Sequence, residues 1–255
     1  MSRGSSIQSH VIVRRAVICT AIALANLAAL WANELRNLTT LNQSGIISKY
    51  KENNQLDDIA QLVWSYSHTV NGITTYRSQT AEGYTCFRGV ALADVHISRI
   101  MGTFSDASLA PRWITMLKTM VENRSRDMGP DIVYQLYNLP WPVQDRDLVL
   151  QRSWVFDAKS KHIEVLYTST RDQNHPEING VIRAYTPHTQ WKFTQNIKNN
   201  MQTIIELESV LDSKGVLPVF LTNFIQSSCP HKIISGLIKL AENNITVPMR
   251  SIAGW

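Results

Sequence analysis

The side chains that could do acid–base, nucleophilic or metal chemistry are scattered along this chain rather than grouped in a motif. The sequence has no Gly-x-Ser-x-Gly elbow, no His-Glu-x-x-His pair, no phosphate-binding glycine loop and no dinucleotide fingerprint. None of its 7 histidines has metal-ligand spacing to another histidine or to a cysteine. We therefore expect no catalytic residue, no metal site and no cofactor, and a protein that is not an enzyme.

Two closely spaced carboxylates follow a proline-rich corner, Pro140 to Pro142. Proline fixes φ and removes backbone donors, so this corner must be a turn, and an alternating strand is expected from Leu148. Asp145 and Asp147 are two residues apart where the strand begins, so their side chains should share one face. An acid–base pair is one interpretation. Because an arginine separates them, we expect them instead to accept hydrogen bonds from neighbouring backbone donors.

Apolar residues at helical spacing predict an amphipathic helix at the start of the domain. They are Leu56, Ile59, Val63, Tyr66 and Val70. Two strands joined as a hairpin are expected over 73–78 and 84–93. Asp94 is the expected cap of a helix over 95–102, and a further helix is expected over 111–120.

Strands dominate the second half of the chain. Stretches of β-branched and aromatic residues predict strands over 131–138, 148–157, 162–171, 180–194 and 201–212. Their short connections imply an antiparallel sheet. After Gly215, a broad apolar face predicts a long helix to about Leu240, bent at Pro230. A curved antiparallel sheet around one helix has more apolar inner surface than the helix can fill, which predicts an α+β fold with an internal pocket.

Several landmarks occur along the chain in a distinctive order. They are Trp113, Glu122-Asn123, the run Pro140–Asp147 (PWPVQDRD), Gly180–Arg183 (GVIR), Trp191 and Asp212–Pro218 (DSKGVLP). This order and spacing resemble the START (StAR-related lipid transfer) family from about Val63 to Leu240, and the bacterial branch is the most similar. The resemblance implies the helix-grip fold, in which a curved antiparallel sheet wraps around the long C-terminal helix. It also implies a single lipid, or another hydrophobic ligand, in an internal tunnel of about 300–1,000 Å³.

The resemblance places the side chain of Arg183 inside that tunnel. A buried guanidinium must be paired or must meet a polar ligand head. Sterol-carrying relatives supply an acid from an earlier strand, where this chain offers only Gln135 and Asn138. We therefore expect an anionic phospholipid or fatty acid rather than a sterol. The alternative is a structural ion pair between Arg183 and Glu164 or Glu206.

Further residues are expected to contact the ligand, as aromatic, aliphatic or amide groups of the tunnel wall. They are Gln135, Tyr137, Trp113, Trp141, Tyr167, Ile205, Leu221, Phe224 and Ile225.

Most of the net charge of +5 resides in the N-terminal part of the chain. Residues 1–50 hold five basic side chains and one acidic side chain, which leaves 20 basic and 19 acidic groups in the rest. A nearly neutral domain without a basic face is not expected to bind nucleic acid.

Residues 16–32 form an uncharged, mostly apolar stretch after Arg14 and Arg15. The pattern fits a secretory signal or uncleaved anchor, a mitochondrial presequence, or an amphipathic or buried helix. We expect a membrane-associated or exported protein, with mitochondrial targeting as the alternative. The expected organisation is a targeting or anchor segment over 1–32, a polar linker over 33–55, a START-like lipid-binding domain over 56–244 and a tail over 245–255.

The function expected from these features is non-enzymatic lipid binding or transfer at a membrane surface. One alternative is a START-like accessory subunit, with a degenerate cavity and protein partners in a membrane assembly. Another is a helix-grip enzyme such as a cyclase or hydrolase, for which no positioned acid–base pair is visible.

Overall fold

The computed structural model of this chain describes residues 62–123, 131–243 and 246–255. The expected targeting segment, the linker and the first residues of the expected domain lie outside these ranges. No helix within the described ranges is long and apolar enough to cross a membrane.

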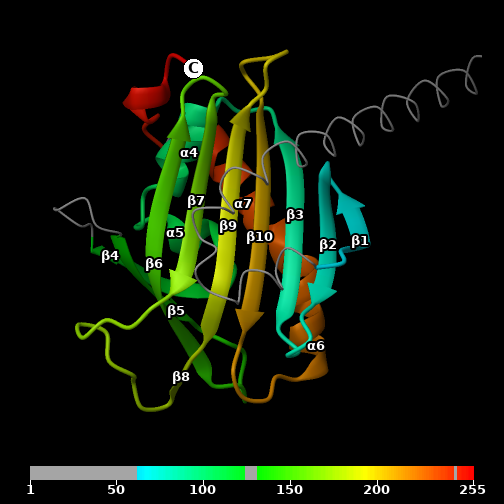
Figure 1. Ribbon diagram of the computed structural model, residues 1–255, viewed down its shortest axis with the longest axis vertical. Helices are drawn as coiled ribbons and strands as arrows, with labels where there is room; N and C mark the ends of the chain where they lie inside the picture. The colour runs from blue at the N-terminus through cyan, green and yellow to red at the C-terminus, as the bar shows by residue number, and fades with distance from the viewer. Residues whose placement is uncertain (1–61, 124–130, 244–245) are drawn as a thin grey trace, which may run out of the picture. The chain divides into compact units, whose positions relative to one another are not determined.

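A curved sheet of 10 strands dominates the described part of the chain (Figure 1). The strands are β1 (Ser65–Val70), β2 (Ile73–Gln79), β3 (Thr85–Ala93), β4 (Leu117–Asn123), β5 (Asp131–Tyr137), β6 (Asp145–Asp157), β7 (His162–Ser169), β8 (Val181–Arg183), β9 (Tyr185–Gln195) and β10 (Thr203–Asp212). Their order in space is β1-β2-β3-β10-β9-β7-β6-β5-β4, and neighbours in this order run antiparallel. The short β8 pairs parallel with the start of β6.

Helices pack on the concave side of the sheet, behind it in Figure 1. They are α4 (Ile97–Phe104), α5 (Ala110–Trp113), α6 (Val219–Asn223), the π-helical turn η2 (Phe224–Ser228), α7 (Cys229–Glu242) and the 3-10 turn η3 (Arg250–Ile252). Because the residues that join α6, η2 and α7 all have right-handed helical angles, these three elements form one continuous helix. The expected α+β fold, an antiparallel sheet around a long C-terminal helix, is confirmed.

The expected bend at Pro230 corresponds to a local change of helix type. Pro230 lacks an N–H group, and in a regular α-helix its ring would clash with the carbonyl of Gln226. The π turn Phe224–Ser228 contains Gln226 and ends directly before the proline-containing helix α7. Turns of this type occur mostly as single insertions within α-helices, frequently at functional sites.

The prediction that Tyr66 and Val70 belong to a helix is wrong, because Ser65–Val70 is strand β1. Asn71 and Gly72 both have positive φ, 49° and 75°, as a two-residue hairpin of type I′ requires. This turn sets Val70 opposite Ile73 on β2. The Asn-Gly turn therefore decided the structure, and the helical spacing of apolar residues did not.

Two other expected helices differ in their bounds. Helix α4 begins at Ile97, and its cap is His96, whose ring accepts a hydrogen bond from the Ser98 N–H at 3.2 Å; Asp94 instead accepts one from the Gln202 side chain at 2.6 Å. The helix expected over 111–120 ends at Trp113, and strand β4 occupies its second half. Pairing with β5 thus overrides the helix propensity of that segment.

Aromatic side chains form the centre of the core between helix α4 and the sheet. The Phe104 ring lies 5.0 Å from Phe193, 5.4 Å from Trp191 and 5.8 Å from Trp113, measured between ring centroids. Most of these contacts are tilted or edge-on, the geometry that aromatic quadrupoles favour. This cluster closes one side of the space beneath the C-terminal helix.

Candidate ligand cavity

An internal cavity of about 170 Å³ lies between the concave face of the sheet and the C-terminal helix. Side chains from β3, β5, β6, β7, β9 and β10 form its floor, and Phe224, Ile225, Cys229 and Ile233 of the helix form its roof. The cavity is smaller than the expected 300–1,000 Å³. Large side chains, including Phe104 and Trp191, fill part of the space that the curved sheet encloses.

Six of the ten residues expected to bind the ligand lie on the cavity wall. They are Trp113, Gln135, Tyr137, Tyr167, Phe224 and Ile225. Their contact with a ligand remains a prediction. Ile205 and Leu221 are buried, but neither lies on the cavity wall.

Trp141 is also absent from the cavity wall, and its expected position there is wrong. The side chain is 93% exposed. Its neighbours in the corner explain this orientation: the Val143 N–H donates to the Pro140 carbonyl at 3.0 Å, and Asp145 accepts from the Leu139 N–H at 3.1 Å. The chain therefore leaves the cavity wall after Leu139, which lines the cavity, and turns outward at Trp141. The expected role of Asp145 as an acceptor for a backbone donor of the corner is confirmed.

The position of Arg183 contradicts the expectation that it faces the ligand. Its guanidinium pairs with Asp147, with Nε to Oδ1 at 2.7 Å and Nη2 to Oδ2 at 3.0 Å, and it also donates to the carbonyls of His175 and Pro176. The hydrogen bond to Asp147 is the main cause that raises the pKa of Arg183. The alternative prediction of a structural ion pair is therefore correct, but the partner is Asp147 rather than Glu164 or Glu206.

The alternation of side chains along β6 explains why the cavity wall contains Arg146 rather than Arg183. Leu148 and Leu150 line the cavity, so Arg146 and Arg152 point to the same concave face, and Asp147 points away from it. Arg146 is 5% exposed and lies on the cavity wall. The sequence analysis missed Arg146. The apolar residues Leu148 and Leu150 could have indicated it, because they lie on the same face of the strand as Arg146.

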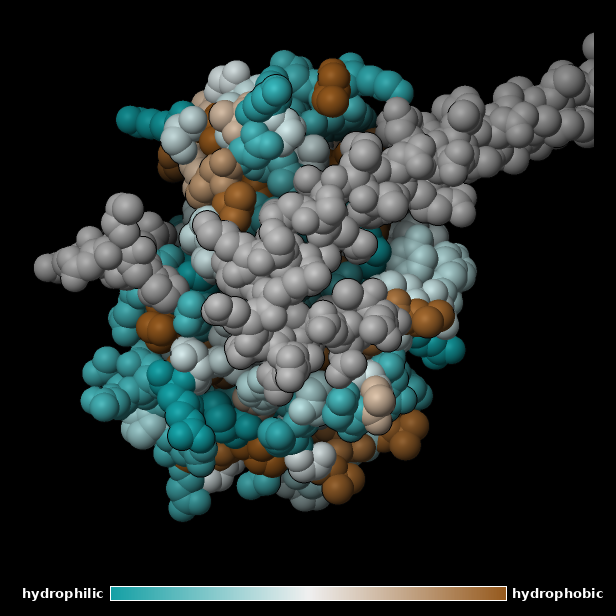
Figure 2. Space-filling view, in the orientation of Figure 1, coloured by the Kyte–Doolittle hydropathy of each residue, from teal (hydrophilic) through white to brown (hydrophobic). Residues whose placement is uncertain are grey.

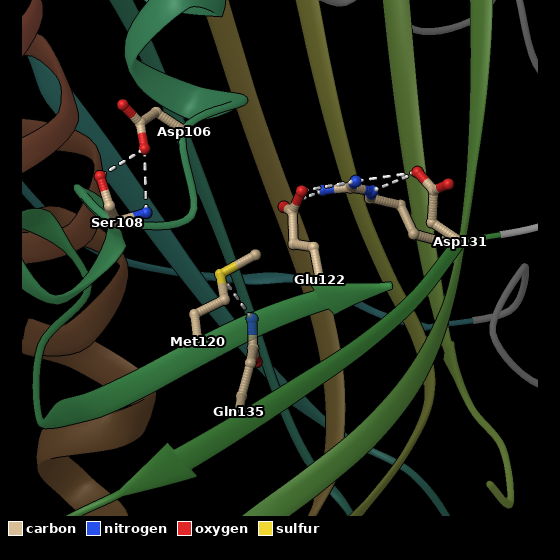
Figure 3. A network of polar contacts seen from close by, with 7 residues as sticks. Asp106, Ser108, Met120, Glu122, Asp131 and Gln135 are labelled. Atoms are coloured by element: carbon tan, nitrogen blue, oxygen red, sulfur yellow. Dashed lines mark hydrogen bonds and ion pairs between the residues drawn. The ribbon is translucent and has the colours of Figure 1, made fainter. Parts of the chain in front are cut away.

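The two inward arginines of β6 have different partners. Glu122 and Asp131 converge on the Arg152 guanidinium, Glu122 Oε2 at 3.1 Å and Asp131 Oδ2 at 2.8 Å from Nη2 (Figure 3). Within the described ranges, Arg146 donates only to backbone carbonyls: from Nε to Ser213 at 3.4 Å, from Nη2 to Lys214 at 3.3 Å and from Nη1 to Gln144. Burial lowers the pKa of Arg146, and the nearby Asp145 opposes this shift.

Two of the polar groups on the wall, the Tyr137 phenol and the Gln135 amide, bond to one another. Tyr137 donates to Gln135 Oε1 at 2.9 Å, and the Gln135 amide lies 3.8 Å from the Met120 sulfur (Figure 3). Burial raises the pKa of Tyr137, and it raises that of Tyr167 to about 12. Both phenols are therefore neutral at physiological pH.

No family model matches the sequence. An uncharacterized protein of Pseudomonas aeruginosa is 24% identical over 182 residues, which cover 70% of this chain and 87% of that protein. Among solved structures, human STARD10 superposes with a TM-score of 0.64 at 15% identity, over 74% of this chain and 78% of STARD10.

Two further structures are similar. Human StAR-related lipid transfer protein 5 has a TM-score of 0.63 at 13% identity, over 85% of this chain and 97% of that protein. A StAR-related lipid transfer protein from Xanthomonas axonopodis has a TM-score of 0.57 at 19% identity, over 71% of this chain and 99% of the solved fragment. The chain has the START fold. The resemblance inferred from the sequence is thus confirmed at the level of the fold.

In this START fold, the groups on the cavity wall are poorly suited to acid–base chemistry. The wall has neither a histidine nor a carboxylate among the described residues. No group of three or more His, Cys, Asp or Glu side chains in the described ranges could hold a metal ion. The wall can surround the apolar part of a molecule and offer hydrogen-bond donors to a polar group on it.

The thiol of Cys229 reports on access to the START cavity. Cys229 lies on the roof, and burial raises its pKa to about 12. Because an unperturbed thiol has a pKa of about 8.5, we expect Cys229 to react with iodoacetamide at pH 8 at least ~100-fold more slowly than a free thiol. Peptide mass spectrometry of the native protein over time measures this rate, with the urea-unfolded chain as control. A native rate equal to that of the unfolded chain would contradict an enclosed cavity.

Proposed function

We propose that this protein binds one lipid or other hydrophobic ligand in the cavity and carries it between membranes, without catalysing a reaction. The observation that carries this proposal is the mostly apolar cavity between the sheet and the C-terminal helix. Apolar walls with a few polar groups are typical of small-molecule sites. The names of the similar START structures, which include two StAR-related lipid transfer proteins, support the same class of ligand.

The cavity volume of about 170 Å³ implies that the roof moves when a ligand enters. We propose that the C-terminal helix moves and that η2 is where it yields. The π turn places Phe224 and Ile225 over the cavity, and it interrupts the regular hydrogen bonding of the helix.

Extraction of the purified full-length protein, followed by lipid mass spectrometry, tests this function. A carrier is expected to retain a lipid at about one molecule per chain, or to bind one when titrated. A chain that neither co-purifies with lipid nor binds any lipid of a broad panel would not be a carrier.

A second candidate function is that of an accessory subunit with a filled cavity. The small volume and the aromatic cluster around Phe104 favour it. This role predicts a folded protein that binds no lipid and co-purifies with a protein partner.

Exposed apolar side chains near the cavity give the carrier a surface for membrane contact. Val216, Val219 and Phe220 are 93%, 75% and 63% exposed, and they flank Leu217, which lines the cavity. Hydrophobic side chains are visible at the lower end of the molecule in Figure 2, the end at which β10 finishes and α6 begins in Figure 1. Arg146 ties this loop to the corner that bears Trp141, because it bonds to the carbonyls of Ser213 and Lys214.

Replacing Trp141 and Phe220 together with serine is expected to slow lipid transfer between vesicles by on the order of tenfold, since each large side chain contributes about 1.5–3 kcal/mol when buried. Binding of a soluble ligand should change little, because neither side chain lines the cavity. A fluorescence transfer assay measures the rate. The matched control is Ile197→Ser, which removes an apolar side chain that is 92% exposed on the turn at the opposite end of β10. Equal slowing by the control would argue against a specific surface.

The location of the protein is a separate proposal that rests on the sequence alone. We propose that residues 1–32 direct it to a membrane or across one, because an apolar stretch follows Arg14 and Arg15. Cell fractionation of the full chain and of a variant without these residues tests it, and an unchanged soluble location for both would contradict it.

A further inference from the structure

We infer that the cavity selects amphiphiles with an anionic head group, a carboxylate or a phosphate, and that Arg146 binds that head. This inference rests on the proposed function, since it specifies the ligand of the same cavity. Among the described residues, Arg146 is the one charged side chain on the wall. It comes from the first residues of β6 and lies 5% exposed, with Leu139 and Ser213 also on the wall nearby.

The hydrogen bonds of Arg146 leave part of its donor capacity unused. A guanidinium carries five N–H donors, and Arg146 uses three, all toward backbone carbonyls. Two of these bonds, to Ser213 at 3.4 Å and to Lys214 at 3.3 Å, are at the long limit for hydrogen bonds. The carbonyl oxygens hold the guanidinium in place without neutralising its charge.

Comparison with the other arginines of this region shows how unusual this arrangement is. Arg152, which points to the same face of β6, bonds to the carboxylates of Glu122 and Asp131. Arg183, on the other face, bonds to Asp147. In the described part of the chain, Arg146 forms no ion pair with a carboxylate. The carboxylate of Asp145 acts on the charge of Arg146 without forming an ion pair with it, so an anionic ligand that bonds directly to this buried guanidinium would gain from doing so.

The position of Arg146 fits the shape of an amphiphile. Arg146 lies beside the loop that follows β10: a Cβ added to Gly215 would be 3.9 Å from Nη2. The remainder of the wall, from Leu148 and Leu150 to Phe104, is largely apolar. An anionic head group at Arg146 would thus lie beside the loop that follows β10, and the apolar tail of the ligand would extend toward the aromatic cluster around Phe104.

Matched pairs of ligands test this inference on the full-length protein. Oleate is compared with methyl oleate, and oleoyl lysophosphatidic acid with monoolein, by displacement of a fluorescent fatty-alcohol probe below the micellar range. Charge-assisted bidentate hydrogen bonds predict that at least one anionic ligand binds about tenfold or more tightly than its neutral partner. A preference within the first pair identifies a carboxylate, and one within the second identifies a phosphate. Equal binding within both pairs would overturn the inference and leave the carrier function intact. Absence of binding for all four ligands would also overturn the inference, and the carrier function would fail as well only if no lipid of the broad panel binds.

Variants locate the preference at Arg146. Arg146→Met removes the charge at similar length and is expected to bring the anionic-to-neutral ratio close to one. Arg146→Lys keeps the charge and is expected to retain a reduced preference, because lysine cannot form the bidentate contact. If the Met variant does not fold, the Lys variant alone provides the test. The matched control is Arg183→Lys, a charge-conserving change on the opposite face of the sheet, for which the ratio should not change. An unchanged ratio in both Arg146 variants would show that Arg146 only fastens the loop after β10.

Discussion

Arg183→Leu is expected to lower the free energy of unfolding by about 3–5 kcal/mol while leaving the selectivity for ligands unchanged. The guanidinium bonds to both carboxylate oxygens of Asp147, whose side chain is only 1% exposed. Without Arg183, Asp147 would be a buried charge with no counter-ion, which costs about this much. Urea denaturation followed by circular dichroism measures the change, and the ligand pairs described above measure selectivity.

Two controls separate the lost pair from a general effect of losing an arginine. Arg88→Leu removes a pair with Glu206 at 2.8 Å whose side chains are 23% and 16% exposed, so about 1 kcal/mol is expected. The double variant Arg183→Leu/Asp147→Leu should recover much of the loss, because no charge then remains buried. A fully stable Arg183→Leu protein with altered selectivity would restore the interpretation that Arg183 meets the ligand.

The arrangement of strands was predictable because it depends on local pattern. Four of the five strands expected in the second half of the chain appear within a few residues of their expected bounds, and the C-terminal helix follows them. The strand expected over 180–194 is divided into β8 and β9, and β8 pairs parallel with β6. Where two local signals competed, pairing decided: Asn71-Gly72 forms a hairpin, and the last residues of the expected first helix, Ser65–Val70, are strand β1. Likewise, Leu117 and its neighbours extend the sheet beside β5.

The identity of the cavity arginine was harder to predict because it depends on the phase of a strand. A shift of one residue sends every side chain of a strand to the other face. The resemblance assigned the inward position to Arg183, whereas the apolar wall positions Leu148 and Leu150 fix the inward set of β6 as the one that contains Arg146. The acid that pairs with Arg183 could not be chosen from sequence alone, because β8 joins β6 by a parallel pairing that places Arg183 beside Asp147.

Phe104→Ala is expected to cost about 3–5 kcal/mol of stability, the range for removing a fully packed aromatic side chain. Phe104 is 3% exposed and has four aromatic partners, of which Phe193 at 5.0 Å and Trp191 at 5.4 Å are nearest. Phe156→Ala is the matched control, since Phe156 is 51% exposed and stacks on Trp154 alone, and about 1 kcal/mol or less is expected. Thermal and urea unfolding of the two variants measure the difference. Equal costs would contradict a core centred on Phe104.

The same variant separates the two candidate functions, because Phe104 also lines the cavity. Truncation to alanine leaves extra space next to the existing 170 Å³, and apolar cavities of this kind bind apolar molecules. If the protein is a carrier, the parent binds lipid and Phe104→Ala shifts its preference toward longer or bulkier chains, measured at low temperature where the variant remains folded. If the aromatic cluster instead closes a degenerate cavity, the parent binds none and Phe104→Ala gains binding. The direction of change upon removing one ring therefore distinguishes a site built to hold a lipid from a fold that has filled its own cavity.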